Sequence, residues 1–154
     1  MKKWLLRGGA ALGVLAIGMF IFLRSIGMFA TQPVYTANGV ALGGTDVVAY
    51  FTDGKPTPGV AEFVARWNGA QWHFASAAHR DQFIAAPERY APQFGGYCAY
   101  AVSHEYTAKT DPAAWSIVDG KLFLNFDLDT QKEWLADRDR FIADGNRNWP
   151  GVLW

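Results

Sequence analysis

Cysteine and charge are both scarce in this 154-residue sequence. The single cysteine, Cys98, cannot form an internal disulfide, so a hydrophobic core must hold the fold together even in an oxidising compartment. Charged residues make up 18% of the chain, with fourteen basic and fourteen acidic side chains. A chain without a basic excess lacks the electrostatic footprint of a nucleic-acid-binding protein.

The motifs of common catalytic sites are also missing. The sequence has three histidines, and it contains no Ser-His-Asp order, no H-x-x-x-H zinc pair, no phosphate-cradling glycine loop and no carboxylate pair at catalytic spacing. We therefore predict a protein without catalytic activity. Catalysis by Cys98 as nucleophile, with His104 as base, is the enzymatic alternative that the residue types allow.

Apolar and aromatic side chains are abundant. Apolar residues make up 51% of the chain and aromatic residues 16%, including seven tryptophans and eleven phenylalanines. This composition excludes a disordered chain, and the length suits one domain with a proper core and a short appendage.

The appendage is the N-terminus, where a hydrophobic run lies between basic residues. Lys2, Lys3 and Arg7 precede an uncharged stretch over residues 8–23, and Arg24 closes it. We predict an uncleaved membrane-spanning anchor, with a cleaved signal peptide and a buried soluble helix as the alternatives. The predicted organisation is an anchor or signal segment over residues 1–30, a linker over 31–37 and a globular domain over 38–154.

The basic residues also predict the orientation of the chain. Three of the four that occur up to Arg24 precede the hydrophobic run, so the positive-inside rule places the N-terminus in the cytoplasm and the domain outside it. The domain keeps ten basic against fourteen acidic residues. Its net charge of about −4 again argues against a nucleic-acid partner and provides no polybasic patch for lipid binding.

An Asn68-Gly69 turn between two alternating apolar stretches predicts a β-hairpin over residues 62–67 and 70–75. The turn sets a register that places six residues on the core-facing side: Trp67 opposite Ala70, Ala65 opposite Trp72, and Phe63 opposite Phe74. His73 lies opposite Val64 on the outer face. Ser76 then caps a helix over residues 77–85, in which Phe83 faces the sheet and His79 is partly inward.

Four further elements complete the predicted fold. Thr45 and Asp46 precede a helical turn over residues 47–51, and a buried short helix covers residues 97–102. A second hairpin joins residues 115–118 to 121–126 across Asp119-Gly120. A C-terminal amphipathic helix over residues 131–144 has a capping box of Thr130 and Glu133, an inner stripe of Trp134, Leu135, Arg138, Phe141 and Ile142, and Gly145 as its end. The predicted class is α+β, in which the two hairpins form one small antiparallel sheet packed with short helices and the C-terminal amphipathic helix.

Several motifs in this order resemble a known family. The run NGAQWHFAS over residues 68–76, followed by Phe83, Pro87 and Tyr90, resembles the YHS domain, a small hairpin-plus-helix module related to the TRASH metal-binding domains. The stretches GGTDVVAYFTDGKP, PERYAPQFGGYCAYAV, WSIVDGKLFLNF and NWP are similar to exported bacterial YHS-domain proteins, over residues 38–151. The resemblance implies the fold, a periplasmic domain at the inner membrane and a link to heavy metals.

The sequence departs from the family at the metal-linked motif. Family members that bind metal carry Cys-Ser-x-x-Cys after the second strand, and here those positions read Ala75-Ser76-Ala77-Ala78-His79. A zinc site with four Cys or His ligands is therefore not available from this motif. Cu(I) needs only two or three ligands, and a thiolate with imidazoles suits it. We take Cys98, His79 and His104 as candidate ligands, which a folded-back Gly95-Gly96 loop would bring together.

Two functions remain open at this point. The leading prediction is a membrane-anchored, extracytoplasmic YHS-domain protein that binds a transition-metal ion, copper first and zinc second, without catalysis. In the alternative, a metal-free structural or interaction module uses an aromatic surface groove to bind a protein partner or a small apolar ligand. Cys98 would then be a small buried core residue, as free cysteine usually is.

Overall fold

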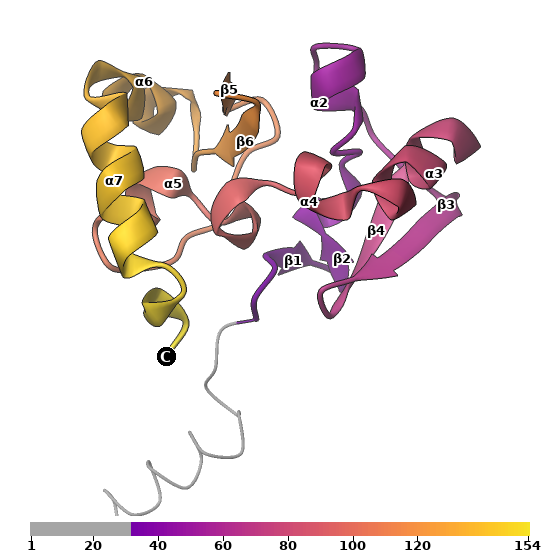
Figure 1. Ribbon diagram of the computed structural model, residues 1–154, viewed down its shortest axis with the longest axis horizontal. Coiled ribbons are helices and arrows are strands. Elements are labelled where there is room, and N and C mark those ends of the chain that lie inside the picture. Colours follow the sequence, from indigo (N-terminus) through magenta and orange to yellow (C-terminus); the bar gives the residue numbers. More distant parts are fainter. Residues whose placement is uncertain (1–31) are drawn as a thin grey trace, which may run out of the picture. The chain divides into compact units, whose positions relative to one another are not determined.

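The computed structural model describes residues 32–154, which form an α+β fold (Figure 1). The predicted anchor or signal segment over residues 1–30 lies outside the described residues. Within the described part of the chain, no helix is long and apolar enough to cross a membrane. Part of the predicted linker belongs to the fold, because strand β1 begins at Thr36 and Val34 is buried.

The larger sheet has four strands. Their order across the sheet is β1 (Thr36–Ala37), β2 (Val40–Ala41), β4 (Ala70–Phe74) and β3 (Val60–Trp67). β2 pairs with β4 in parallel, whereas the other neighbours are antiparallel. The parallel pairing is possible because a long crossover separates these two strands in sequence.

The crossover from β2 contains η1 (Leu42–Gly44) and α2 (Ala49–Thr52). The predicted helical turn is therefore present, two residues later than expected at its start. The Asp46 carboxylate accepts hydrogen bonds from the backbone N–H groups of Val48 at 2.9 Å and Ala49 at 3.3 Å. Asp46 thus caps this turn, as its position in the sequence predicts.

The first hairpin has the predicted turn and most of the predicted register. Trp67 pairs with Ala70, Ala65 with Trp72, and Val64 with His73. The predicted pairing of Phe63 with Phe74 is wrong, because the register shifts between Val60 and Val64 and Phe74 pairs with Val60 instead. Extra residues in β3 form a bulge at this point, which the turn chemistry at the other end of the hairpin does not reveal.

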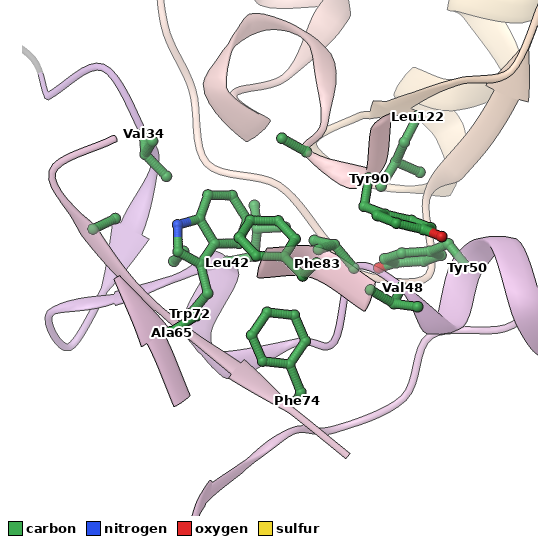
Figure 2. Packing of buried hydrophobic residues seen from close by; sticks show 14 of the residues in the cluster. Val34, Leu42, Val48, Tyr50, Ala65, Trp72, Phe74, Phe83, Tyr90 and Leu122 are labelled. Atoms are coloured by element: carbon green, nitrogen blue, oxygen red, sulfur yellow. The ribbon is translucent and has the colours of Figure 1, made fainter. Parts of the chain in front are cut away.

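Helix α3 (Ala77–Ala85) has the predicted bounds and its Ser76 cap, and it packs against β3 and β4. The Phe83 ring lies 5.1 Å from the ring centroids of both Trp72 and Phe74, and Figure 2 shows the three rings together. Phe83 is 1% exposed. The core of the larger sheet is therefore built on the side that the hairpin register predicts.

The second hairpin is present but forms a sheet of its own. β5 (Trp115–Val118) pairs with β6 (Lys121–Leu124) in the predicted register, in a separate two-stranded sheet. The prediction of one antiparallel sheet made from both hairpins is therefore wrong. The strand that extends the first hairpin is β2, which pairs with β4 in place of the second hairpin.

Three short elements connect the two sheets along the chain. They are α4 (Pro87–Tyr90), η2 (Gln93–Gly96) and α5 (Ala99–Ser103), and α5 is the predicted buried short helix. Gly95 has φ 61°, and a Cβ there would lie 2.0 Å from the carbonyl oxygen of Pro33. Only glycine allows the two backbones to approach this closely.

The C-terminal region contains two helices where the sequence predicts one. α6 (Leu128–Ala136) and α7 (Arg138–Asn148) meet at Asp137, whose backbone is not helical, and η3 (Gly151–Leu153) follows. The cap of α6 is Asp127, which accepts from the Thr130 N–H at 2.7 Å. The predicted capping box of Thr130 and Glu133 is therefore wrong, because the helix begins three residues earlier and Thr130 lies inside it.

The break at Asp137 changes which residues face inward. Trp134 and Phe141 are buried as predicted and Ile142 is half-buried, but Leu135 and Arg138 are exposed. Gly145 lies inside α7 and does not end it. The buried residues of this part form a second core cluster with Phe94, Tyr97, Ala99, Val102, Phe123 and Leu153.

Candidate functional site

Cys98 lies at the cap position of α5, in the interior of the fold. Its side chain is 1% exposed, and Sγ lies 3.8 Å from Oδ1 of Asn125, which is also fully buried. Burial raises the pKa of the Cys98 thiol, although backbone N–H groups nearby, that of Ala101 foremost, act in the opposite direction. A protonated, enclosed thiol is a poor nucleophile and a poor metal ligand.

His79 lies in the first turn of α3, where a buried carboxylate holds its ring. Nδ1 is 2.7 Å from Oδ2 of Asp46, and Nε2 is 3.3 Å from Oγ1 of Thr52. A carboxylate only accepts hydrogen bonds, so the Nδ1 atom carries the proton and Nε2 is the basic nitrogen of the neutral ring. The side chain of His79 is 15% exposed, whereas that of Asp46 is completely buried.

Asp46 contacts His79 and His79 contacts Thr52, as the acid, base and nucleophile of a catalytic triad do. The Thr52 hydroxyl, however, is not positioned as a nucleophile. Thr52 Oγ1 also lies 2.8 Å from a carboxylate oxygen of Asp53 and 3.2 Å from the carbonyl of Val48. A hydroxyl has one proton to donate, and three acceptors surround this one. The geometry therefore supports a structural network rather than an activated nucleophile.

His104 belongs to a third, separate environment at the end of α5. Its Nδ1 lies 2.8 Å from the carbonyl oxygen of Tyr100 and 3.0 Å from Oγ of Ser103. The imidazole stacks on the Tyr100 ring with centroids 4.4 Å apart, and the Phe141 ring is 5.7 Å away. Hydrogen bonding and stacking account for its position.

The structure does not bring the three predicted metal ligands into one group. Cys98 contacts Asn125, His79 contacts Asp46, and His104 contacts Tyr100. Among residues 32–154, no set of three or more His, Cys, Asp and Glu side chains is arranged to hold a metal ion.

A pocket beside α7 offers a different kind of site. It has a volume of about 350 Å³, and we call it the tryptophan pocket. Its walls come from the β3–β4 hairpin, α4, η2 and the C-terminal segment. The lining residues are Pro33, Val34, Trp67, Asn68, Trp72, Glu88, Ala91, Pro92, Gln93, Phe94, Gly95, Asn146, Trp149, Pro150 and Leu153.

Aromatic contacts hold the walls of the tryptophan pocket in place. The Trp72 indole N–H donates to the carbonyl oxygen of Trp67 at 3.0 Å, and their ring centroids are 5.9 Å apart. In the C-terminal part of the lining, the Trp149 ring centroid lies 6.1 Å from that of Phe94 and 6.2 Å from that of Tyr97. Trp67 and Trp149 are half-buried, so parts of their rings remain available to a ligand.

The sequence predicts an aromatic groove as an alternative but does not identify the residues of this pocket. The hairpin register places Trp67 and Trp72 on the core face, and Trp149 is part of the NWP stretch. The available signal was the position of Trp67 and Trp149 at the ends of their elements, where large rings are only partly covered. Placing them on one pocket required the tertiary structure.

Comparisons with protein-family models, with curated proteins and with solved structures gave no match for this chain.

Proposed function

We propose that residues 38–154 form a YHS-like domain that acts outside the cytoplasm as a non-catalytic binding module. Its ligand is a small, largely apolar molecule that occupies the tryptophan pocket. In this proposal, the segment over residues 1–30 anchors the module in the inner membrane or directs its export to the periplasm.

The observation that carries this proposal is the composition of the tryptophan pocket. Binding sites for small molecules are concave, about 300–1,000 Å³ in volume, and lined mainly by apolar and aromatic groups with a few polar ones. At about 350 Å³, with the rings of Trp67, Trp72, Phe94 and Trp149 on its walls, this pocket meets the description at its small end. Its size favours a small molecule over a protein segment as the occupant.

The test is a titration that follows the indole N–H signals of the tryptophans by NMR. The full-length chain, isotope-labelled and purified in detergent, is titrated with 2-phenylethanol, and a detergent blank corrects for partition of the alcohol. We expect saturable shifts in the signals of the three pocket tryptophans, because an aromatic ligand changes the ring-current field at each indole. Trp149→Ala should weaken binding by roughly tenfold, since burying an aromatic contact is worth about 1–2 kcal/mol.

A matched control is Trp115→Ala, because Trp115 is half-buried but does not line the pocket. This variant should bind 2-phenylethanol as the wild type does. Linear, unsaturable shifts in the wild type, or equal affinity in wild type and Trp149→Ala, would remove the proposal.

Metal binding stays a second candidate function because of one observation, the hydrogen bond between the Asp46 carboxylate and Nδ1 of His79. A carboxylate on Nδ1 fixes the tautomer and the orientation of the ring, as it does for many metal-bound histidines. An anaerobic titration with Cu(I) tests it in wild type, His79→Ala and Cys98→Ser. A stoichiometric site that only His79→Ala removes would support this candidate, and copper uptake that neither variant changes would exclude it.

A further inference from the structure

We infer that the ligand of the tryptophan pocket is a small organic cation, an aryl-alkyl amine in its ammonium form or a quaternary ammonium compound. This inference rests on the proposed function and adds the charge of the ligand to it. Three features of the described residues carry it, namely the charge of the lining, the arginines beside it and the faces of its rings.

The first feature is a negative charge without a positive partner. Glu88, in the first turn of α4, is the charged residue that lines the tryptophan pocket, and no Lys, Arg or His lines it within residues 32–153. None of the ion pairs between described residues involves Glu88. A carboxylate at the wall of an apolar pocket favours a cation and disfavours an anion.

The second feature is that the two arginines next to Glu88 and Asn146 in the sequence are engaged elsewhere. The Arg89 guanidinium lies over the Tyr90 ring, 5.4 Å from its centroid. Arg147, on α7, forms an ion pair with Asp144. Neither residue lines the pocket, so Glu88 keeps its charge available for a ligand. The acidic excess of the domain, fourteen acidic against ten basic residues, favours the approach of cations as well.

The third feature is the set of tryptophan rings that line the pocket. The Trp72 N–H is already used by the carbonyl oxygen of Trp67. The Trp72 indole itself is 1% exposed, so the rings that a ligand can reach are those of the half-buried Trp67 and Trp149. The faces of aromatic rings attract cations, those of tryptophan most strongly. The amide side chains of Asn68, Gln93 and Asn146 also line the pocket, and their oxygens accept hydrogen bonds from an ammonium group.

The experiment compares three ligands that share one carbon skeleton and differ in charge. They are 2-phenylethylamine, which is a cation at pH 7, neutral 2-phenylethanol and anionic phenylacetate, each titrated into the full-length chain with the indole N–H readout. We expect the amine to bind roughly three- to thirtyfold more tightly than the alcohol, from an exposed ion pair and a cation–π contact together, and the anion to bind most weakly.

Glu88→Gln tests whether the Glu88 charge causes the preference for the amine over the alcohol, because it removes the charge and keeps the shape of the side chain. This variant should lose most of the preference for the amine and bind the alcohol with unchanged affinity. Glu62→Gln, an exposed residue on β3 away from the lining, is the matched control and should keep the preference.

The outcomes separate this inference from the proposed function. Equal affinities for amine and alcohol, or a preference that survives in Glu88→Gln, would overturn the cation while leaving the pocket as a binding site for apolar ligands. If none of the three compounds shifts the pocket tryptophans, both proposals fall. Tighter binding of phenylacetate than of the amine would also overturn the inference.

Discussion

Asp46 is a single residue on which two parts of the fold converge. Its completely buried carboxylate accepts hydrogen bonds from the N–H groups of Val48, Ala49 and Ala75, and it contacts the His79 ring at 2.7 Å. The first two belong to the α2 turn, whereas Ala75 and His79 lie at the end of β4 and in α3. The sequence predicts the cap but not the links to β4 and α3, because both cross 29 or more positions of the chain.

Replacing Asp46 with Ala should destabilise the protein strongly. The substitution leaves buried N–H groups without an acceptor, which lowers the free energy of unfolding by about 3–5 kcal/mol. His79→Ala removes one partner at the margin of the network and should lower it by about 1 kcal/mol. Urea denaturation of both variants measures the difference. Asp46→Asn keeps one acceptor oxygen, so it should lose more stability than His79→Ala, and it can be measured even if Asp46→Ala does not fold. Equal losses of stability in all variants would contradict the network.

At the scale of single elements, turn and cap residues in the sequence predict the hairpins and the helix that they bound. Two hairpins and helix α3 are predicted correctly. The hairpins are predicted by the Asn68-Gly69 and Asp119-Gly120 turns, and α3 by its Ser76 cap and by Pro87 beyond its end. The bulge in β3 and the break at Asp137 were missed, because packing imposes both against a sequence pattern that continues through them. For the same reason Gly145 was interpreted as a helix end, although it is an interior residue of α7.

Gly145 lets α7 approach the Phe94 ring, so Gly145→Ala should destabilise the protein even though alanine favours helices. A Cβ at this position would lie 2.6 Å from an atom of that ring. Overpacking of this kind lowers the free energy of unfolding by about 1–3 kcal/mol, against a gain in helix propensity of about 1 kcal/mol. Thermal or urea denaturation gives the net loss.

A second substitution tests the cause of that loss. In Phe94→Leu the smaller side chain leaves room for the added methyl group, so Gly145→Ala should be less harmful in this background than in the wild type. Additive losses in the double variant would show that the Phe94 ring is not what Gly145 accommodates.

At the scale of the whole molecule, the candidate sites depended on contacts that the sequence does not specify. The sequence identifies Cys98, His79 and His104 by residue type, and in the fold each has a different hydrogen-bond partner. Proximity between residues 19 and 25 positions apart is a property of the tertiary fold, and a loop such as Gly95-Gly96 can turn in more than one direction. The residues of the tryptophan pocket could not be predicted for the same reason, since its walls come from elements that are far apart in the sequence.

The burial of tyrosine and cysteine side chains determines how the stability of the protein changes at alkaline pH. Burial raises the pKa of Tyr50, Tyr97 and the Cys98 thiol, and the Asp111 charge raises the pKa of Tyr50 further. The Tyr50 hydroxyl also donates to the carbonyl oxygen of Pro112 at 2.9 Å. The folded protein therefore keeps these protons at a pH where the unfolded chain has lost them, so the unfolded state binds fewer protons and stability falls as the pH rises.

We expect the free energy of unfolding to stay level between about pH 7 and pH 8 and to decrease above about pH 9–10, where unfolded cysteine and tyrosine ionise. Each such group contributes a slope of up to about 1.4 kcal/mol per pH unit. Tyr50→Phe removes one of these groups and the hydrogen bond to Pro112 with it, so it should be less stable than the wild type at neutral pH and lose less stability in alkali. Tyr106→Phe, at a residue that is 51% exposed, is the matched control and should keep the slope of the wild type. Urea denaturation across this pH range gives the slopes, and an unchanged slope in Tyr50→Phe would mean that its phenol is not what couples folding to protons.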